Sequence, residues 1–247
     1  MNVAQKATSV TGLGATANST HTVDRWQTNV GSTAGRFTMT QTADGPNGIS
    51  ANCLKIDCTT ADTSIAAAEA FILHQAIEGQ NVQRIGKGVA GAKQITASFY
   101  VKASAVFTFA LELFDGDNNR QITKLFDTTT DWVRHEITFP ADVDDGSSPF
   151  DDDNAASLDF GFWIHAGATF TGGTLNTASW ANYTNANRAV GIDSIFSNTA
   201  NNFFLTGVQL EVGPVATEFE QEDIGVTQNK CFRYYYKWES DAGFNFV

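Results

Sequence analysis

Hydrophobic and polar residues alternate, one by one, in several separate stretches of this chain. In residues 95–102 the two kinds fall on opposite faces: Ile95, Ala97, Phe99 and Val101 against Thr96, Ser98, Tyr100 and Lys102. A period of two is that of a β-strand with one buried face. The same pattern recurs at 107–113, 133–139, 158–165 and 204–212. The chain is therefore predicted to be all-β.

Clusters of turn-forming residues separate these stretches. They are DGPNG at 44–48, DGDNN at 115–119, DDGSSP at 144–149 and GG at 172–173. Short strands between regular turns favour an antiparallel sandwich or barrel. Helical signal is confined to residues 65–71 and 222–234, and neither segment has a long hydrophobic stripe at helical spacing. No internal repeat of about 20 to 50 residues is present, which disfavours a β-helix.

The composition and charge exclude several classes of function. Of the 247 residues, 42% are hydrophobic and 17% are charged, which is typical of a globular chain. The formal net charge of -12 repels phosphate backbones and anionic headgroups, so we expect no nucleic-acid partner. No hydrophobic run approaches the roughly 20 residues of a membrane helix. The opening residues MNVAQK carry no hydrophobic stretch of signal-peptide type. We expect no membrane insertion.

The cysteines do not predict a disulfide framework. Cys53 and Cys58 flank LKID, a predicted strand that would hold them roughly 16 Å apart and on opposite faces. Either could pair with Cys231, but free buried thiols are the expectation for all three. Free thiols are compatible with assembly in the cytoplasm.

Nine short blocks, in one order, resemble a module that is widespread in bacteriophage tail fibres and other phage structural proteins. Each block is weak alone, but their order and spacing are specific and span nearly the whole chain. They are VAQKATS (3–9), DRW (24–26), NCLKID (52–57), IEGQN (77–81), SFYVKA (98–103), NANR (185–188), TGVQLEVG (206–213), ATEFE (216–220) and CFRYY (231–235).

The resemblance implies a β-jelly-roll similar to carbohydrate-binding modules, carried on a homotrimeric fibre with other virion proteins as partners. It places the chain in the virion, assembled in the cytoplasm of the bacterial host. Family members usually carry further β-structure on both sides of these blocks, so the chain is expected to be either an excerpt of a longer fibre or a short stand-alone virion protein. We expect a module over residues 1–213 and an aromatic-rich tail, or the start of a following β-region, over 214–247.

Catalytic motifs are not convincing in this sequence. Residues 86–93 have the two-glycine spacing of a phosphate loop, but Ala92 stands where the lysine must reach the phosphates. No nucleophile-elbow pattern occurs, and the four histidines are scattered. A glycosidase pair could hide among the 27 acidic residues, although loops and solvent faces account for them. We expect no enzymatic activity and no cofactor.

Two acidic segments have some features of metal sites. Residues 115–119 begin like a calcium loop, but Arg120 replaces the sharp-turn glycine and no glutamate follows at the twelfth position, so a hairpin turn is expected. The acidic stretch 142–153 could gather hard cations by charge density, although a solvated loop explains it better. Calcium binding by these loops stays open, and the sequence predicts no metal site.

Candidate glycan-binding residues are aromatics that the core does not need. Trp163 falls on the polar face of its predicted strand, the same face as Asp159. Its ring could therefore stack on a sugar while the Asp159 carboxylate accepts hydrogen bonds from the sugar hydroxyls. The alternative is that a loop or a second subunit covers this face. Trp180 and Tyr183, within the stretch 174–187, are similar candidates. Trp26 and Trp132 are better explained by packing.

Three functions follow as expectations. The first is a tail-fibre or appendage module of a phage virion that contacts a host-surface polysaccharide. The second is a capsid decoration or head-fibre protein. The third is a carbohydrate-binding module of a glycan-degrading enzyme. No residue distinguishes the first from the second, because location on the particle is not encoded in the chain.

Overall fold

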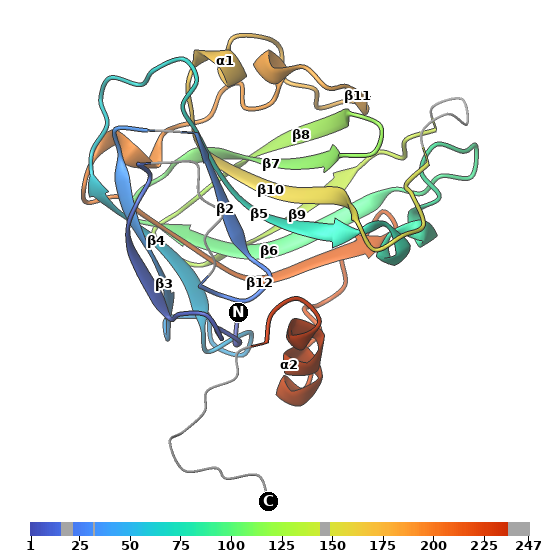
Figure 1. Ribbon diagram of the computed structural model, residues 1–247, viewed down its shortest axis with the longest axis horizontal. Coiled ribbons are helices and arrows are strands. Elements are labelled where there is room, and N and C mark those ends of the chain that lie inside the picture. The colour runs from blue at the N-terminus through green and yellow to red at the C-terminus, as the bar shows by residue number, and fades with distance from the viewer. Residues whose placement is uncertain (16–21, 32, 144–148, 237–247) are drawn as a thin grey trace, which may run out of the picture.

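The computed structural model describes residues 1–15, 22–31, 33–143 and 149–236 and has the architecture of an antiparallel β-sandwich (Figure 1). Sheet A contains six strands in the order β1 (Ser9–Leu13), β3 (Arg36–Thr42), β4 (Cys53–Thr60), β12 (Asn202–Val212), β6 (Ile95–Ala103) and β9 (Val133–Phe139). Sheet B contains six strands in the order β11 (Ala181–Asn182), β8 (Arg120–Asp127), β7 (Thr108–Asp115), β10 (Ala156–Ala166), β5 (Ala70–Glu78) and β2 (Gln27–Gly31). The prediction of an all-β jelly roll with little helix is confirmed.

The inner faces of the two sheets form the main core. The alternating residues predicted to be buried are buried in β6, β7 and β10, and phenylalanines from both sheets meet there edge to face. In β12 the prediction was wrong, because Phe203 and Leu205 lie in the core and Val212 is exposed; the alternation of this strand is broken by a bulge. Phe99 of β6 lies 5.0 Å from Phe162 of β10, and Phe109 of β7 lies 5.7 Å from Phe203 of β12, measured between ring centroids. Edge-to-face contacts add to the hydrophobic gain of burial, which explains why this chain uses so many phenylalanines.

A bulge interrupts the long strand β12 between Thr206 and Gln209. Gly207 lies at the bulge with φ of 57°, a left-handed conformation that non-glycine residues rarely adopt. A Cβ at this position would lie 2.8 Å from a ring carbon of Tyr100 and 3.1 Å from Ile49. Glycine is therefore required here both for its backbone conformation and for close packing.

Helices are few and short in the described residues. The 3-10 turns η1 (Gly79–Asn81) and η2 (Gln83–Ile85) follow β5, and α1 (Ala168–Thr171) follows β10. The 3-10 turns η3 (Asn185–Asn187) and η4 (Ile195–Ser197) precede β12. None of the helices in this part of the chain is long and apolar enough to cross a membrane.

The segment after β12 packs back onto the sandwich. Its helix α2 (Ile224–Phe232) starts at Asp223, whose side chain accepts a hydrogen bond from the amide of Gly225. Beyond the helix, Arg233 donates two hydrogen bonds to Glu78 at 2.9 and 2.8 Å. Figure 1 shows α2 at the opposite end of the molecule from α1, near the N-terminus.

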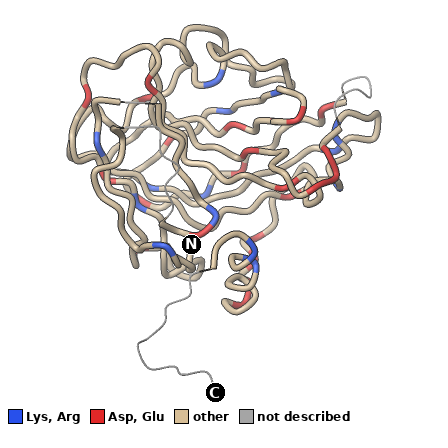
Figure 2. Tube along the Cα trace, viewed as in Figure 1, with Lys and Arg blue, Asp and Glu red and all other residues tan. Residues whose placement is uncertain are grey.

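The cysteines are free and buried, as predicted, and Cys53 and Cys58 lie on one strand, β4. Burial raises the pKa of the Cys53 thiol to about 11. Part of the predicted turn at 144–149 and of the aromatic tail, including Trp238, lies outside the described residues. Figure 2 shows basic and acidic positions scattered over sheets, loops and α2.

Candidate functional site

The outer face of sheet B collects most of the residues that the sequence suggested for ligand binding. On β10 the outward positions are those of Asp159, Gly161 and Trp163. The register places Asp159 opposite Phe114 of β7 and Trp163 opposite Ala110. On the other side of β10, Gly161 lies opposite His74 of β5. These side chains therefore form one surface across three adjacent strands.

Trp163 is fully buried on this face, so the expectation of an exposed ring was wrong. The segment that contains α1 and the turn η3 covers it, and Figure 1 shows this segment on the side of sheet B away from sheet A. Phe170 packs against its ring at 5.2 Å between centroids, in a second small core with Ala70, Ile72, Ala110 and Ala189. The structure shows the alternative, in which a loop covers this face. No sugar can stack on Trp163 while that segment stays in place.

A salt bridge fixes the cover over Trp163. Arg188 donates to both carboxylate oxygens of Glu112, at 2.8 and 2.6 Å, and its guanidinium lies 4.7 Å from the Trp163 ring. It also lies 5.1 Å from the ring of Tyr183. The neighbouring carboxylate raises the pKa of Arg188 despite its burial, so the charge is retained. This arginine belongs to the NANR block and holds the loop to the sheet.

The part of this face that remains open is a band that we call the sheet B strip: Tyr183, Phe114, Asp159 and His74. Tyr183 contacts Phe114 edge to face at 5.3 Å and is 36% exposed. The Asp159 side chain is 39% exposed and lies 3.4 Å from Nδ1 of His74. An aromatic ring, a carboxylate and an imidazole are thus available side by side. That combination offers stacking and hydrogen bonding to a polar ligand.

Trp180 does not join this surface, and its predicted exposure was also wrong. It is buried, its indole N–H donates to the carbonyl of Pro140 at 3.0 Å, and Lys87 lies 5.6 Å from its ring. The structure therefore brings together Asp159, Trp163 and Tyr183 and leaves Trp180 apart. Strand β11 separates them, because Trp180 and Tyr183 stand on either side of this two-residue strand.

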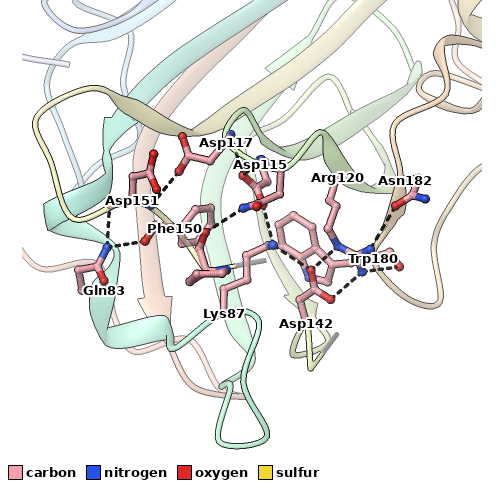
Figure 3. A network of polar contacts seen from close by, with 12 residues as sticks. Gln83, Lys87, Asp115, Asp117, Arg120, Asp142, Phe150, Asp151, Trp180 and Asn182 are labelled. Carbon is pink, nitrogen blue, oxygen red and sulfur yellow. Dashed lines mark hydrogen bonds and ion pairs between the residues drawn. The ribbon is translucent and has the colours of Figure 1, made fainter. Parts of the chain in front are cut away.

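Around Trp180 lies a buried ionic network (Figure 3). The ammonium of Lys87 lies 2.6 Å from Asp115 and 3.0 Å from Asp142, and Arg120 donates twice to Asp142 at 2.7 and 2.8 Å. Asp115 also accepts hydrogen bonds from the amides of Asp117 and Asn118 in the β7–β8 hairpin. The hairpin prediction for residues 115–119 is confirmed. Lys87 supplies the positive charge beside the Asp115 carboxylate. Lys87, from the phosphate-loop-like segment, has a structural role.

A cavity of about 980 Å³ opens between the sheets at the end where the N-terminus and α2 meet the sandwich. Residues of both sheets line it, among them Gln75 and Gln209, and α2 contributes Lys230. Of its aromatic residues, Trp26 and Phe160 are almost completely buried and Phe219 is partly exposed. The cavity offers hydrogen-bonding groups but little exposed aromatic surface, which makes it a weaker sugar platform than the sheet B strip.

One cluster of ionisable side chains went unnoticed in the sequence. Asp62, Glu69 and His165 are all buried and lie together beside the start of β5. His165 is 96 positions from Glu69, and neither stands in a recognisable ligand motif. Only the pairing of β5 with β10 brings them together.

Comparison with protein families gave no match, and comparison with curated proteins gave none either. Solved structures with a similar arrangement include two carbohydrate-binding modules. The family 11 module of the cellulosomal cellulase Lic26A-Cel5E of Clostridium thermocellum has 14% identity and a TM-score of 0.37, over 84% of this chain and 96% of that one. The CBM22-1 xylan-binding domain of Xyn10C from Paenibacillus barcinonensis has 12% identity and a TM-score of 0.37, over 84% and 95%. At these values the likeness is confined to the general layout of the sandwich.

Proposed function

We propose that this chain is a non-catalytic structural module of a bacteriophage virion, from a tail fibre or related appendage, and that its sheet B strip contacts a host-surface glycan. The ordered blocks from VAQKATS to CFRYY support the virion role. The observation that carries the glycan role is the 36% exposed Tyr183, whose ring packs on Phe114, the register neighbour of Asp159 on the outer face of sheet B.

The strip fits weak, polar recognition. A sugar ring that stacks on Tyr183 gains about 1 kcal/mol, and exposed hydrogen bonds to Asp159 and His74 add little net free energy. The affinity of one site is therefore low. Three copies on a fibre, and several fibres on a particle, would raise the avidity by about 10²–10⁴ without any new contact.

A homotrimer is part of this proposal. The segment after β12 exposes a group of hydrophobic side chains: Val215, Ile224, Val226, Tyr234, Tyr235 and Tyr236. Self-association through this segment would bury them. Sedimentation equilibrium at micromolar concentration should give three times the chain mass. A monomer at all concentrations would contradict the trimer but leave the single-site glycan contact untouched.

The glycan contact is tested with Tyr183→Ala and Asp159→Asn. Matched controls are Trp132→Ala, in which a partly exposed ring is removed beside β9 of sheet A, and Asp57→Asn, whose side chain is 33% exposed and pairs with Lys55 on sheet A. On glycan arrays and in host-adsorption assays the two strip variants should lose at least tenfold in binding, while the controls should match the native chain. Equal binding by all five proteins would reject the strip.

A variant of the cavity tests whether the glycan binds there and not on the sheet B strip. Gln209→Ala removes a side chain that lines the 980 Å³ cavity and leaves the strip intact. Loss of glycan binding in this variant alone would move the contact to the cavity. No glycan binding by the native chain would favour a decoration or purely structural role.

The virion role has its own test, which is independent of glycans. Purified particles of the source phage should contain the chain, and antibodies to it should label the tail appendages in electron micrographs. Label confined to the head would favour the capsid decoration alternative. Absence of the chain from particles would overturn the proposal.

A further inference from the structure

Asp62, Glu69 and His165 form a buried set of ligand-type side chains that the proposed function does not use. Asp62 lies in the connection after β4, Glu69 immediately precedes β5, and His165 lies near the end of β10. Their exposed fractions are 4%, 6% and 0%. Two carboxylates and an imidazole are thus held out of water at one point.

The distances suit a small metal ion. One ligand atom from each of the three residues can be chosen so that all lie within 4.8 Å of one another. Nε2 of His165 and Oε2 of Glu69 are 3.2 Å apart. This is close to the edge of a tetrahedron whose centre lies about 2.0 Å from each corner, the usual distance from zinc to nitrogen or carboxylate oxygen.

The imidazole is oriented as in metal sites. Nδ1 of His165 lies 2.8 Å from Oγ of Ser194, and the ring packs edge to face on Phe196 at 4.9 Å. When Nδ1–H donates to Ser194, the lone pair of Nε2 points toward Glu69. A hydrogen bond at the far ring nitrogen is the usual outer-shell support of a histidine ligand.

No lysine or arginine among the described residues pairs with either carboxylate of the cluster. Asp62 accepts hydrogen bonds from the Thr33 hydroxyl and the Ser64 amide and is also hydrogen-bonded to Glu69. Two buried carboxylates in contact are costly unless a proton or a cation lies between them.

We propose that Asp62, Glu69 and His165 bind one divalent transition-metal ion, with zinc as the best fit. A divalent ion balances the two carboxylates, and the imidazole nitrogen favours zinc over calcium or magnesium, which prefer oxygen ligands. A water molecule or the Thr33 hydroxyl can complete the fourth position. The ion ties the connection between β4 and β5 to the end of β10 and stabilises the fold. This site is independent of the glycan contact.

The test is metal binding by the full chain after treatment with a chelator. With zinc at a hundredfold excess over its dissociation constant, the Tm should rise by about 5 °C or more. Mass spectrometry of the metal content should find one zinc per chain, and cobalt should give the visible absorption of a tetrahedral site. A native chain that retains no zinc and shows no shift in Tm overturns the proposal, as does a response to calcium alone.

Two variants separate a metal site from a structural cluster. Glu69→Gln keeps the shape and removes one charge, so the metal-free protein should be as stable as the native chain or more so, yet zinc should no longer raise its Tm. His74→Asn is the control, because His74 also lies beside a carboxylate, Asp159, but on the surface strip. It should bind zinc like the native chain. Undiminished zinc binding by Glu69→Gln would contradict the assignment.

Discussion

The indole N–H of Trp163 donates to Oε2 of Glu112 at 2.8 Å, in the interior of the layer between sheet B and its covering segment. The same carboxylate accepts two hydrogen bonds from Arg188. Glu112 is almost completely buried, so these three bonds compensate for its lost hydration. These hydrogen bonds allow the covering segment to bury part of the outer face of sheet B as a second, smaller core.

The first prediction concerns this salt bridge. Arg188→Met should destabilise the protein by about 3 kcal/mol, because Glu112 would stay buried with only the Trp163 bond. Urea unfolding followed by tryptophan fluorescence measures the loss. The double variant Arg188→Met with Glu112→Met should recover most of it, since no unpaired charge remains. If the single variant lost less than 1 kcal/mol, Arg188 would not hold the covering segment.

Period-two alternation, which depends only on neighbouring residues, was sufficient for β4, β6, β7, β9 and β10. It did not predict β1, β2, β3, β5, β8 or β11, and in β12 it assigned Phe204 and Val212 to the buried face, although Phe203 and Leu205 are the residues in the core. It failed for Trp163. A strand pattern tells which residues share a face but not whether a segment such as 168–192 later covers that face. The covering residue Arg188 lies 76 positions from its partner Glu112. Such contacts depend on tertiary packing and have no local signal.

The same reason explains the cluster around His165. Its partners come from the connection before β5, and their pairing needs the register of β5 against β10. By contrast, the hairpin at 115–119 was predictable, since a turn is decided by the residues within it. The role of Lys87 in neutralising Asp115 was not, because the two lie in separate segments.

The second prediction concerns Lys87. Replacement by Met should destabilise the fold by about 3–5 kcal/mol, because Asp115 is fully buried and would lose its cation. Lys102→Met is the matched control: its partner Asp44 lies at 2.8 Å, but the Asp44 side chain is 52% exposed. That exposed pair should be worth less than about 1 kcal/mol. Equal losses in the two variants, measured by chemical unfolding, would show that burial is not the deciding factor.

The third prediction concerns the bulge in β12. Gly207→Ala should destabilise the protein by about 2 kcal/mol or more, through both the left-handed backbone and the clash with Tyr100. Gly48→Ala is the comparison, because Gly48 has a φ of 78° and nothing within 4 Å of an added Cβ. Only the backbone cost of about 1 kcal/mol should remain there. A thermal melt in which both variants match the native chain would refute the argument.

The fourth prediction concerns pH and the attachment of α2. The hydrogen bonds from Arg233 lower the pKa of Glu78 to about 2, below its usual value of 4.5. The folded state therefore holds this proton less tightly than the unfolded state, so the contribution of the pair to stability is present above pH 4.5 and is lost as the pH falls toward 2. Cys231, buried on α2, reports on the attachment. As the pH falls from 4.5 toward 2, the rate at which a disulfide reagent that is active in acid labels Cys231 should rise more than the rate at which it labels Cys53. Arg233→Gln should label quickly already at neutral pH, and slow labelling of that variant would show that other contacts hold α2.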